Sequence, residues 1–206
     1  MPSVLLIHGG LWEDTGADWF WRRTGVIDGL AGRGFTVIAP DRLRRATSWS
    51  AEASHIASVP ELADGPVTVV GGSFGCAVAV RLALDFPPLV GRLVLAWPAS
   101  TADQFARIRF RAALARQGAP PAVLDALLGT ETLPGATDDE LRTLAGPTAV
   151  VPSAPPNPLH PRSAVDTLLR LLPSAVELPG YPEAPRPEFE SQLESFVETL
   201  AGVAGE

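Results

Sequence analysis

The chain has 206 residues, of which 46% are hydrophobic and 19% charged, and its formal net charge is -7. These values are ordinary for a globular domain with a sizeable core, and they exclude the disordered and collagen-like classes. The negative charge argues against a nucleic-acid partner, because binding to phosphates relies on a basic patch. The single cysteine, Cys76, excludes an internal disulfide, and no cysteine–histidine spacing resembles a zinc site. We therefore expect a small-molecule substrate and no metal or other cofactor.

The amino terminus lacks the charged leading region and the small-residue cleavage site of a signal peptide. Its first apolar run, SVLLIHG, is too short to span a bilayer. Together with the lone cysteine, these features predict a cytoplasmic protein without a membrane partner. The oligomeric state is left open.

Short β-rich segments alternate with helical patterns along the chain, which is typical of a mainly parallel sheet covered by helices on both faces. The predicted strands span residues 3–8, 35–39, 66–71, 92–97, 147–152 and 174–179. The predicted helices between them span residues 19–31, 50–63, 74–86, 162–172 and 187–201. The predicted fold class is therefore α/β, with a six-stranded, mainly parallel sheet flanked by helices.

Residues 98–146 interrupt this alternation. They contain no convincing strand, only helical patterns such as ADQFARIRFRAALARQG and PAVLDALLG, followed by TDDELRTLAG. An excursion of that length at the carboxyl edge of a sheet predicts a helical cap over the site that the edge carries. The expected organisation is a core of residues 1–97 and 147–206 with a cap insertion at 98–146.

The stretch VVGGSFGCAVAV, residues 69–80, joins a predicted strand to an alanine-rich predicted helix. Gly71 and Gly75 flank Ser73, and they remove side chains that would collide where the strand turns sharply into the helix. Such a turn projects the serine hydroxyl above the carboxyl edge of the sheet. It also directs the amide NH of Phe74 and the positive end of the helix toward the same point. Ser73 is therefore the candidate nucleophile.

The first predicted strand ends as LLIHGG, and its two glycines allow the backbone to approach that point closely. We expect the NH groups of Gly10 and Phe74 to form an oxyanion hole. With HGG after the first strand, GGSFG matching G-x-S-x-G after the third, and a cap insertion, the chain resembles the α/β-hydrolase superfamily over essentially its whole length. It starts at the family's third strand and so lacks the two leading antiparallel strands.

The resemblance implies a serine hydrolase, which needs a histidine base and an acid that orients it. The family places the acid after the penultimate strand and the histidine after the last strand. Here those loops read PSAPPNPLHPRSA and LPGYPEAPRPEF. Asn157 stands where the acid is expected, with His160 three residues later, and Glu183 stands near the expected position of the histidine. The standard triad order is absent.

Three interpretations are open at this point. In the first, the roles are exchanged between neighbouring loops, so that His160 is the base toward Ser73 and Glu183 orients it. A variant of this reading takes the acid from Asp103, just after the fourth strand. In the second, His160 is structural, ahead of Pro161 at a helix start, and Ser73 is weakly reactive or serves lyase or cyclase chemistry. In the third, the fold has lost its chemistry and binds a ligand or partner.

We adopt the first interpretation, which predicts a serine hydrolase of the carboxylesterase or thioesterase type acting through an acyl-enzyme on Ser73. Aromatic residues follow the strand ends that face the expected site. Trp12 and Trp97 are the predicted pocket walls, because each follows a carboxyl end directly. Phe74 adds apolar surface beside the serine. We therefore expect a small, largely apolar ester as the substrate.

Overall fold

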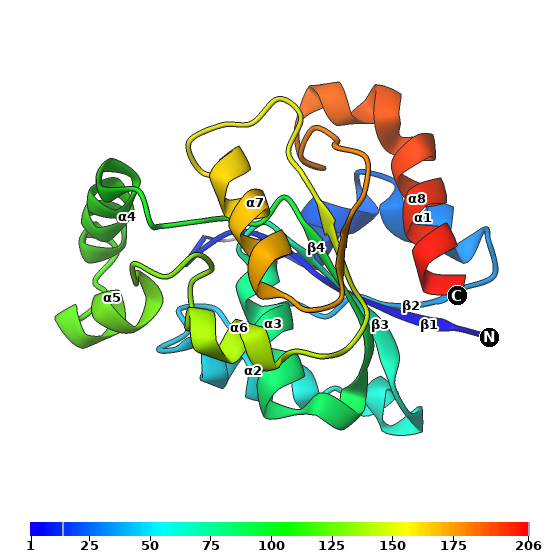
Figure 1. Cartoon of the computed structure of the whole chain (residues 1–206), viewed down its shortest axis with the longest axis horizontal. Coiled ribbons are helices and arrows are strands. Elements are labelled where there is room, and N and C mark those ends of the chain that lie inside the picture. The colour runs from blue at the N-terminus through cyan, green and yellow to red at the C-terminus, as the bar shows by residue number, and fades with distance from the viewer. Residues whose placement is uncertain (14, 206) are drawn as a thin grey trace.

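The computed structural model describes residues 1–13 and 15–205 and arranges the chain as one parallel sheet between two layers of helices (Figure 1). The sheet has six strands in the order β2-β1-β3-β4-β5-β6, and every neighbouring pair is parallel. The strands are β1 (Ser3–Ile7), β2 (Thr36–Ile38), β3 (Val67–Gly72), β4 (Val90–Ala96), β5 (Thr148–Val151) and β6 (Ala175–Glu177). The predicted fold class is confirmed, with each predicted strand in its place.

The helices fall between the strands in the alternation that the sequence predicts. They are α1 (Val26–Ala31), α2 (Trp49–Ala57), α3 (Gly75–Asp85), α4 (Gln104–Arg116), α5 (Pro121–Leu127), α6 (Asp138–Thr143), α7 (Arg162–Leu171) and α8 (Leu193–Gly205). Four short helical turns accompany them: η1 (Asp18–Arg22), η2 (Pro60–Asp64), η3 (Pro87–Leu89) and η4 (Pro187–Gln192).

Two predicted helices are interrupted. The predicted helix at 19–31 divides into η1 and α1 at Gly25, whose φ of 86° is a left-handed conformation that ends the first turn. The predicted helix at 50–63 divides into α2 and η2 ahead of Pro60, which lacks an amide NH and keeps the preceding residue out of the helical region.

The core has two parts, one on each face of the sheet. Side chains of a strand point alternately to opposite faces, so Leu5 and Ile7 of β1 join a cluster with α2, α3 and α7, whereas Val4 and Leu6 join a cluster with α1 and α8. Figure 1 shows α1 and α8 together on one side of the sheet, away from α2 and α3. Burial on both faces explains why the strands read as continuous apolar runs.

The segment between β4 and β5 holds α4, α5 and α6 and has only an isolated bridge between Leu133 and Ala136 in place of a strand. In Figure 1, α4 and α5 project beyond the sheet. By contrast, α6 packs on the core through buried Leu141, and Arg81 of α3 binds Glu140 at 2.9 Å. The regular structure of this segment is thus helical, with turns and coil between the helices, and α4 and α5 are the helices that extend outward.

None of the helices in the described part of the chain has both the length and the hydropathy needed to cross a membrane.

Candidate active site

Ser73 lies in the tight turn between β3 and α3. Its φ of 53° is a left-handed backbone conformation, rare for a residue with a side chain, and its amide NH donates to the carbonyl of Ala96 at 2.9 Å. A Cβ at Gly71 would lie 2.6 Å from the Gly75 carbonyl oxygen, and one at Gly75 would lie 2.3 Å from the Ile7 carbonyl oxygen. Both contacts are with backbone and are too short for any side chain. The two glycines therefore permit the close packing of β3, α3 and β1 that presents Ser73.

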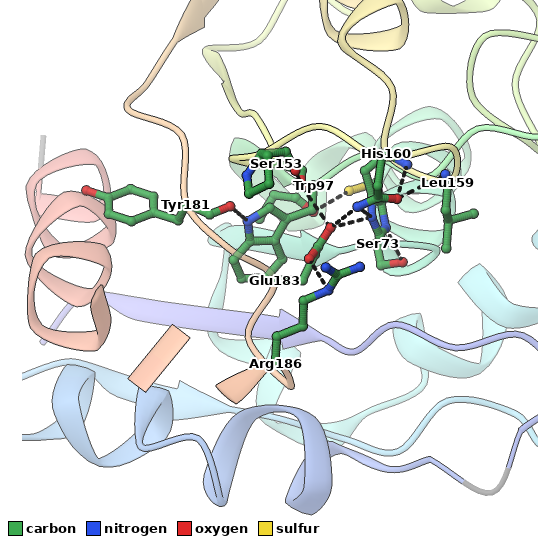
Figure 2. Close-up of polar contacts among 12 residues, drawn as sticks. Ser73, Trp97, Ser153, Leu159, His160, Tyr181, Glu183 and Arg186 are labelled. Atoms are coloured by element: carbon green, nitrogen blue, oxygen red, sulfur yellow. Dashed lines mark hydrogen bonds and ion pairs between the residues drawn. The ribbon is translucent and has the colours of Figure 1, made fainter. Parts of the chain in front are cut away.

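Three side chains form one chain of hydrogen bonds (Figure 2). The Oγ of Ser73 lies 2.9 Å from Nε2 of His160, and Nδ1 of His160 lies 2.8 Å from Oε1 of Glu183. All three residues are buried. A carboxylate only accepts hydrogen bonds, so Nδ1 of the neutral imidazole carries the proton and Nε2 offers its lone pair to the serine hydroxyl. The arrangement is that of a serine, its base and an orienting acid.

Three further residues surround the carboxylate of Glu183. Ser153 Oγ donates to Oε1 at 2.8 Å and Arg186 Nε lies 2.5 Å from Oε2 (Figure 2). The side-chain amide of Asn157 also donates to Oε1. The side-chain Oδ1 of Asn157 accepts from the backbone amides of Leu159 and His160, which shapes the loop that presents the imidazole. Asn157, at the position where the resemblance called for an acid, thus supports the loop and the carboxylate.

Burial acts to raise the pKa of Glu183, but hydrogen bonds from His160 and Ser153 outweigh it and lower that pKa from 4.5 to about 2. The carboxyl group is therefore ionised at any pH near neutrality. An ionised acid beside Nδ1 holds the imidazole in one tautomer and stabilises its protonated form.

The two expected oxyanion donors come from the loop after β1 and from the turn that holds Ser73. Gly10 follows β1 with a φ of 87°, and Phe74 is the residue that precedes α3. Among the residues that the structure describes, neither amide NH has a hydrogen-bond acceptor. Their role as oxyanion donors stays a prediction.

A model of the alpha/beta hydrolase family matches residues 4–200. The chain belongs to this family. The solved structure of the meta-cleavage product hydrolase CumD of Pseudomonas fluorescens resembles it with a TM-score of 0.71 at 21% identity, over 98% of this chain and 92% of that one. At that identity the likeness shows the shared fold alone.

Two curated relatives from Mycobacterium tuberculosis match shorter stretches. The uncharacterized protein Rv2715 is 41% identical over 105 residues, which are 46% of this chain and 28% of its own length. Lipase LipV is 45% identical over 75 residues, which are 32% of this chain and 29% of its own length. The chain therefore spans less than a third of each of these relatives.

Compared with the order implied by the family resemblance, the histidine and the acid have exchanged loops. His160 lies between β5 and α7, and Glu183 lies between β6 and η4. Because β5 and β6 are parallel neighbours in the sheet, both loops leave it at the same edge and their side chains meet in either order. The alternative acid of the sequence analysis, Asp103, is elsewhere: its carboxylate caps α4 by accepting from the amide of Ala106 at 2.7 Å. The prediction of Asp103 as the acid is therefore wrong.

A buried ion pair fixes the HGG loop of this alpha/beta hydrolase family member. The guanidinium of Arg42 binds both oxygens of Glu52, at 2.7 and 2.6 Å, and its Nη1 also donates to the carbonyls of His8 and Gly10. The amide of Arg42 donates to Nε2 of His8 at 3.0 Å, so Nδ1 of His8 carries the ring proton and donates to the Gly9 carbonyl. These contacts set the backbone that includes the expected oxyanion donor Gly10.

Sequence reasoning did not single out Arg42 and Glu52, because a bidentate pair ten residues apart leaves no local pattern. Burial, followed by the positive charge of Arg42, lowers the pKa of His8 from 6.5 to about 4, so this histidine is neutral near pH 7. His8 therefore supports the loop.

The pocket at Ser73 has walls other than those predicted. A cavity of about 260 Å³ is lined by Trp19, Phe20, Ser73, His160, Glu183, Pro185 and Arg186. Trp97 is instead fully buried in the core, stacked on Phe196 with ring centroids 5.0 Å apart. Trp12 donates to the carbonyl of Ala46 and lines a small separate hollow beside the HGG loop. The predictions of Trp12 and Trp97 as walls are thus wrong. Both residues have left-handed φ values, 59° for Trp12 and 52° for Trp97.

Cys76 and His55 do not line this pocket. Cys76 is buried in α3, its thiol donates to the Gly71 carbonyl, and burial raises the pKa of that thiol. His55 contacts the carbonyl of Asp41 from α2. Among the described residues, no cluster of His, Cys, Asp and Glu side chains is arranged to hold a metal ion.

Proposed function

We propose that this alpha/beta hydrolase is a serine hydrolase of the carboxylesterase or thioesterase type that forms an acyl-enzyme on Ser73. The observation behind the proposal is the hydrogen-bonded chain from Ser73 Oγ through His160 to Glu183, with steps of 2.9 and 2.8 Å. Both distances are within the range needed for proton transfer and orientation.

In the proposed reaction, Ser73 Oγ attacks the carbonyl carbon of the ester as its proton passes to Nε2 of His160. Glu183 stabilises the resulting imidazolium, and the amides of Gly10 and Phe74 donate to the oxyanion. The tetrahedral intermediate collapses, the bond to the leaving group breaks, and His160 returns the proton to the departing oxygen or sulfur. Water, activated by His160, then hydrolyses the acyl-enzyme and restores the serine.

The alternative is a decayed site used as a lyase, a cyclase or a binding module. That alternative rests on a histidine too far from Ser73 to act on it. The 2.9 Å contact and the three supporting groups around Glu183 favour the hydrolase instead.

The pocket favours a small, largely apolar ester. Trp19, Phe20 and Pro185 supply apolar surface beside the nucleophile. Phe74, the residue next to Ser73, meets the ring of Phe110 from α4 edge to face, with centroids 5.3 Å apart. Apolar walls around a few polar groups are typical of small-molecule sites.

The test is labelling of the protein by a fluorophosphonate probe, together with turnover of short p-nitrophenyl esters. We expect rapid labelling of the wild type, no labelling of Ser73→Ala, and a fall in kcat/KM of at least about a hundredfold in His160→Ala, which lacks the general base. His55→Ala is the matched control and keeps full activity, because His55 lies outside the site. Labelling that is absent, or indifferent to His160, would contradict the proposal.

A further inference from the structure

A second and larger cavity lies between α4 and the loop that carries His160. It has a volume of about 600 Å³. The side facing the relay includes Asn157 and Arg186, both of which bind Glu183. The other lining residues come from α4 and the same loop: Ala106, Ile108, Arg109, Phe110, Ala112, Ala113, Arg116, Pro158 and Leu159.

Arg186 is the residue common to this cavity and the Ser73 pocket. Its Nε is bound to Glu183 (Figure 2), and among the described residues its two terminal nitrogens have no acceptor. The guanidinium therefore presents free donors at the wall that separates the two spaces. A ligand extending from Ser73 toward α4 passes this residue.

The charges of the lining all have one sign. Arg109, Arg116 and Arg186 are its ionisable residues, and no carboxylate lines the cavity. Arg109 and Arg116 are seven residues apart, so they lie on one face of α4 two turns from each other. Within the described chain, neither has an acidic partner.

The arginines elsewhere on α4 are satisfied by the protein itself. Arg111 pairs with Asp125 of α5 at 2.7 Å, and Arg107 donates to the carbonyls of Thr101 and Ala102. The unpaired arginines are thus the two that face the cavity. The chain has a formal net charge of -7, so the positive lining of this cavity is opposite in sign to the protein as a whole.

We propose that this cavity binds the anionic end of the substrate, a carboxylate or a phosphate, while its ester lies at Ser73. The inference rests on the proposed hydrolase function and names the substrate class: an amphiphilic ester with an apolar stem. Phe110, Pro158 and Leu159 contact the stem, and the guanidinium groups of Arg109 and Arg116 bind the anionic oxygens, for which their planar donor sets are suited.

The test compares two series of p-nitrophenyl esters of equal length, one with a terminal carboxylate and one ending in a methyl group. Acyl chains of four to ten carbons vary the distance between the ester and the terminal carboxylate. We expect kcat/KM to favour the carboxylate series at one chain length. In the Arg109→Gln/Arg116→Gln variant that preference falls about tenfold, mainly through KM, and high salt weakens it in the wild type.

Arg111→Gln is the matched control, because it removes a positive charge from the same helix outside the cavity. It leaves the preference unchanged. A phosphate in place of the terminal carboxylate shows which anion binds more tightly. If the wild type hydrolyses the neutral esters but shows no carboxylate preference, or if Arg111→Gln lowers the preference as much as the double variant, the anion site is wrong and the hydrolase stands.

Binding is measured separately from turnover. In Ser73→Ala, calorimetry compares the monomethyl ester of a dicarboxylic acid with its dimethyl ester. The monoester binds more tightly, and the Arg109→Gln/Arg116→Gln changes abolish the difference. This result without hydrolysis in the wild type would support the anion site and overturn the hydrolase. Equal binding of both esters would overturn the anion site.

Discussion

Glu183 and Asp103 are the two carboxylates that sequence reasoning offers as partners for His160, and their surroundings differ in kind. Glu183 is buried and bonded to Nδ1 of His160, whereas Asp103 is exposed and caps α4. A carboxylate orients an imidazole only by direct contact. The position of either acid along the chain therefore does not decide which of them orients His160. The low pKa of Glu183, about 2, keeps it charged beside the base.

A pair of isosteric variants tests which of the two acids orients His160. Glu183→Gln removes the charge and leaves Nδ1 of His160 without its preferred acceptor, so we expect kcat/KM for a p-nitrophenyl ester to fall at least about a hundredfold. Asp103→Asn keeps a good helix cap and is expected to retain full activity. Similar losses in both variants, or none in Glu183→Gln, would show that Glu183 is not the acid.

At the scale of elements, α2 is tied to the loop after β1 by charges that lie in the protein interior. Glu52 of α2 and Arg42 are both almost fully buried, and Arg42 also binds two carbonyls of the HGG loop. Removing one partner of such a pair leaves the other charge buried and unpaired, which costs more than the intact pair contributes. The loop that holds Gly10 therefore depends on α2, a helix that contributes none of the described residues lining the Ser73 pocket.

Glu52→Gln is expected to lower the free energy of unfolding by about 3 kcal/mol or more, because it leaves the Arg42 guanidinium without its counter-charge. Urea denaturation followed by tryptophan fluorescence measures the change. Asp125→Asn breaks the exposed pair with Arg111 and serves as the control, with an expected loss below about 1 kcal/mol. A loss in Glu52→Gln no larger than in this control would show that the buried pair does not hold the loop.

At the scale of the whole molecule, the neutral His8 links folding to pH. Its pKa is about 4 in the folded protein against 6.5 for an ordinary histidine. Between these values the unfolded chain binds a proton that the folded chain does not, so stability falls as the pH falls from about 6.5 to about 4. The contribution of the neutral His8 to stability is present in full at pH values above 6.5, the pKa of an ordinary histidine.

We expect the stability advantage of wild type over His8→Gln to shrink by about 2 kcal/mol between pH 7 and pH 5, since one pKa unit corresponds to about 1.4 kcal/mol. Glutamine keeps an acceptor for the Arg42 amide and does not titrate. Urea denaturation of both proteins at a series of pH values measures the difference, with His55→Gln as the exposed control. A difference that is constant with pH would contradict the titration.

Local pattern was sufficient for the strands and for the turn that holds Ser73, the candidate nucleophile. Apolar runs bounded by glycine and proline predicted all six strands. A strand that is buried on both faces consists of consecutive apolar residues, which are visible in the sequence. The spacing of Gly71, Ser73 and Gly75 likewise identified the elbow, since its backbone demands are met within five residues. The exchanged pair of His160 and Glu183 could be predicted from the sequence, because each residue follows one of two neighbouring strands.

What the sequence by itself determined, then, is the order of strands and helices, the sharp turn at Ser73 and the few histidines and carboxylates from which a relay is built. The tertiary structure decided which of these groups meet. It chose Glu183 over Asp103, turned Trp12 and Trp97 away from the pocket, and placed Trp19, Phe20 and Arg186 there instead. The physical reason is that hydrogen bonds and cavities form between side chains from separate elements, whose distances depend on how the whole sheet and its helices pack.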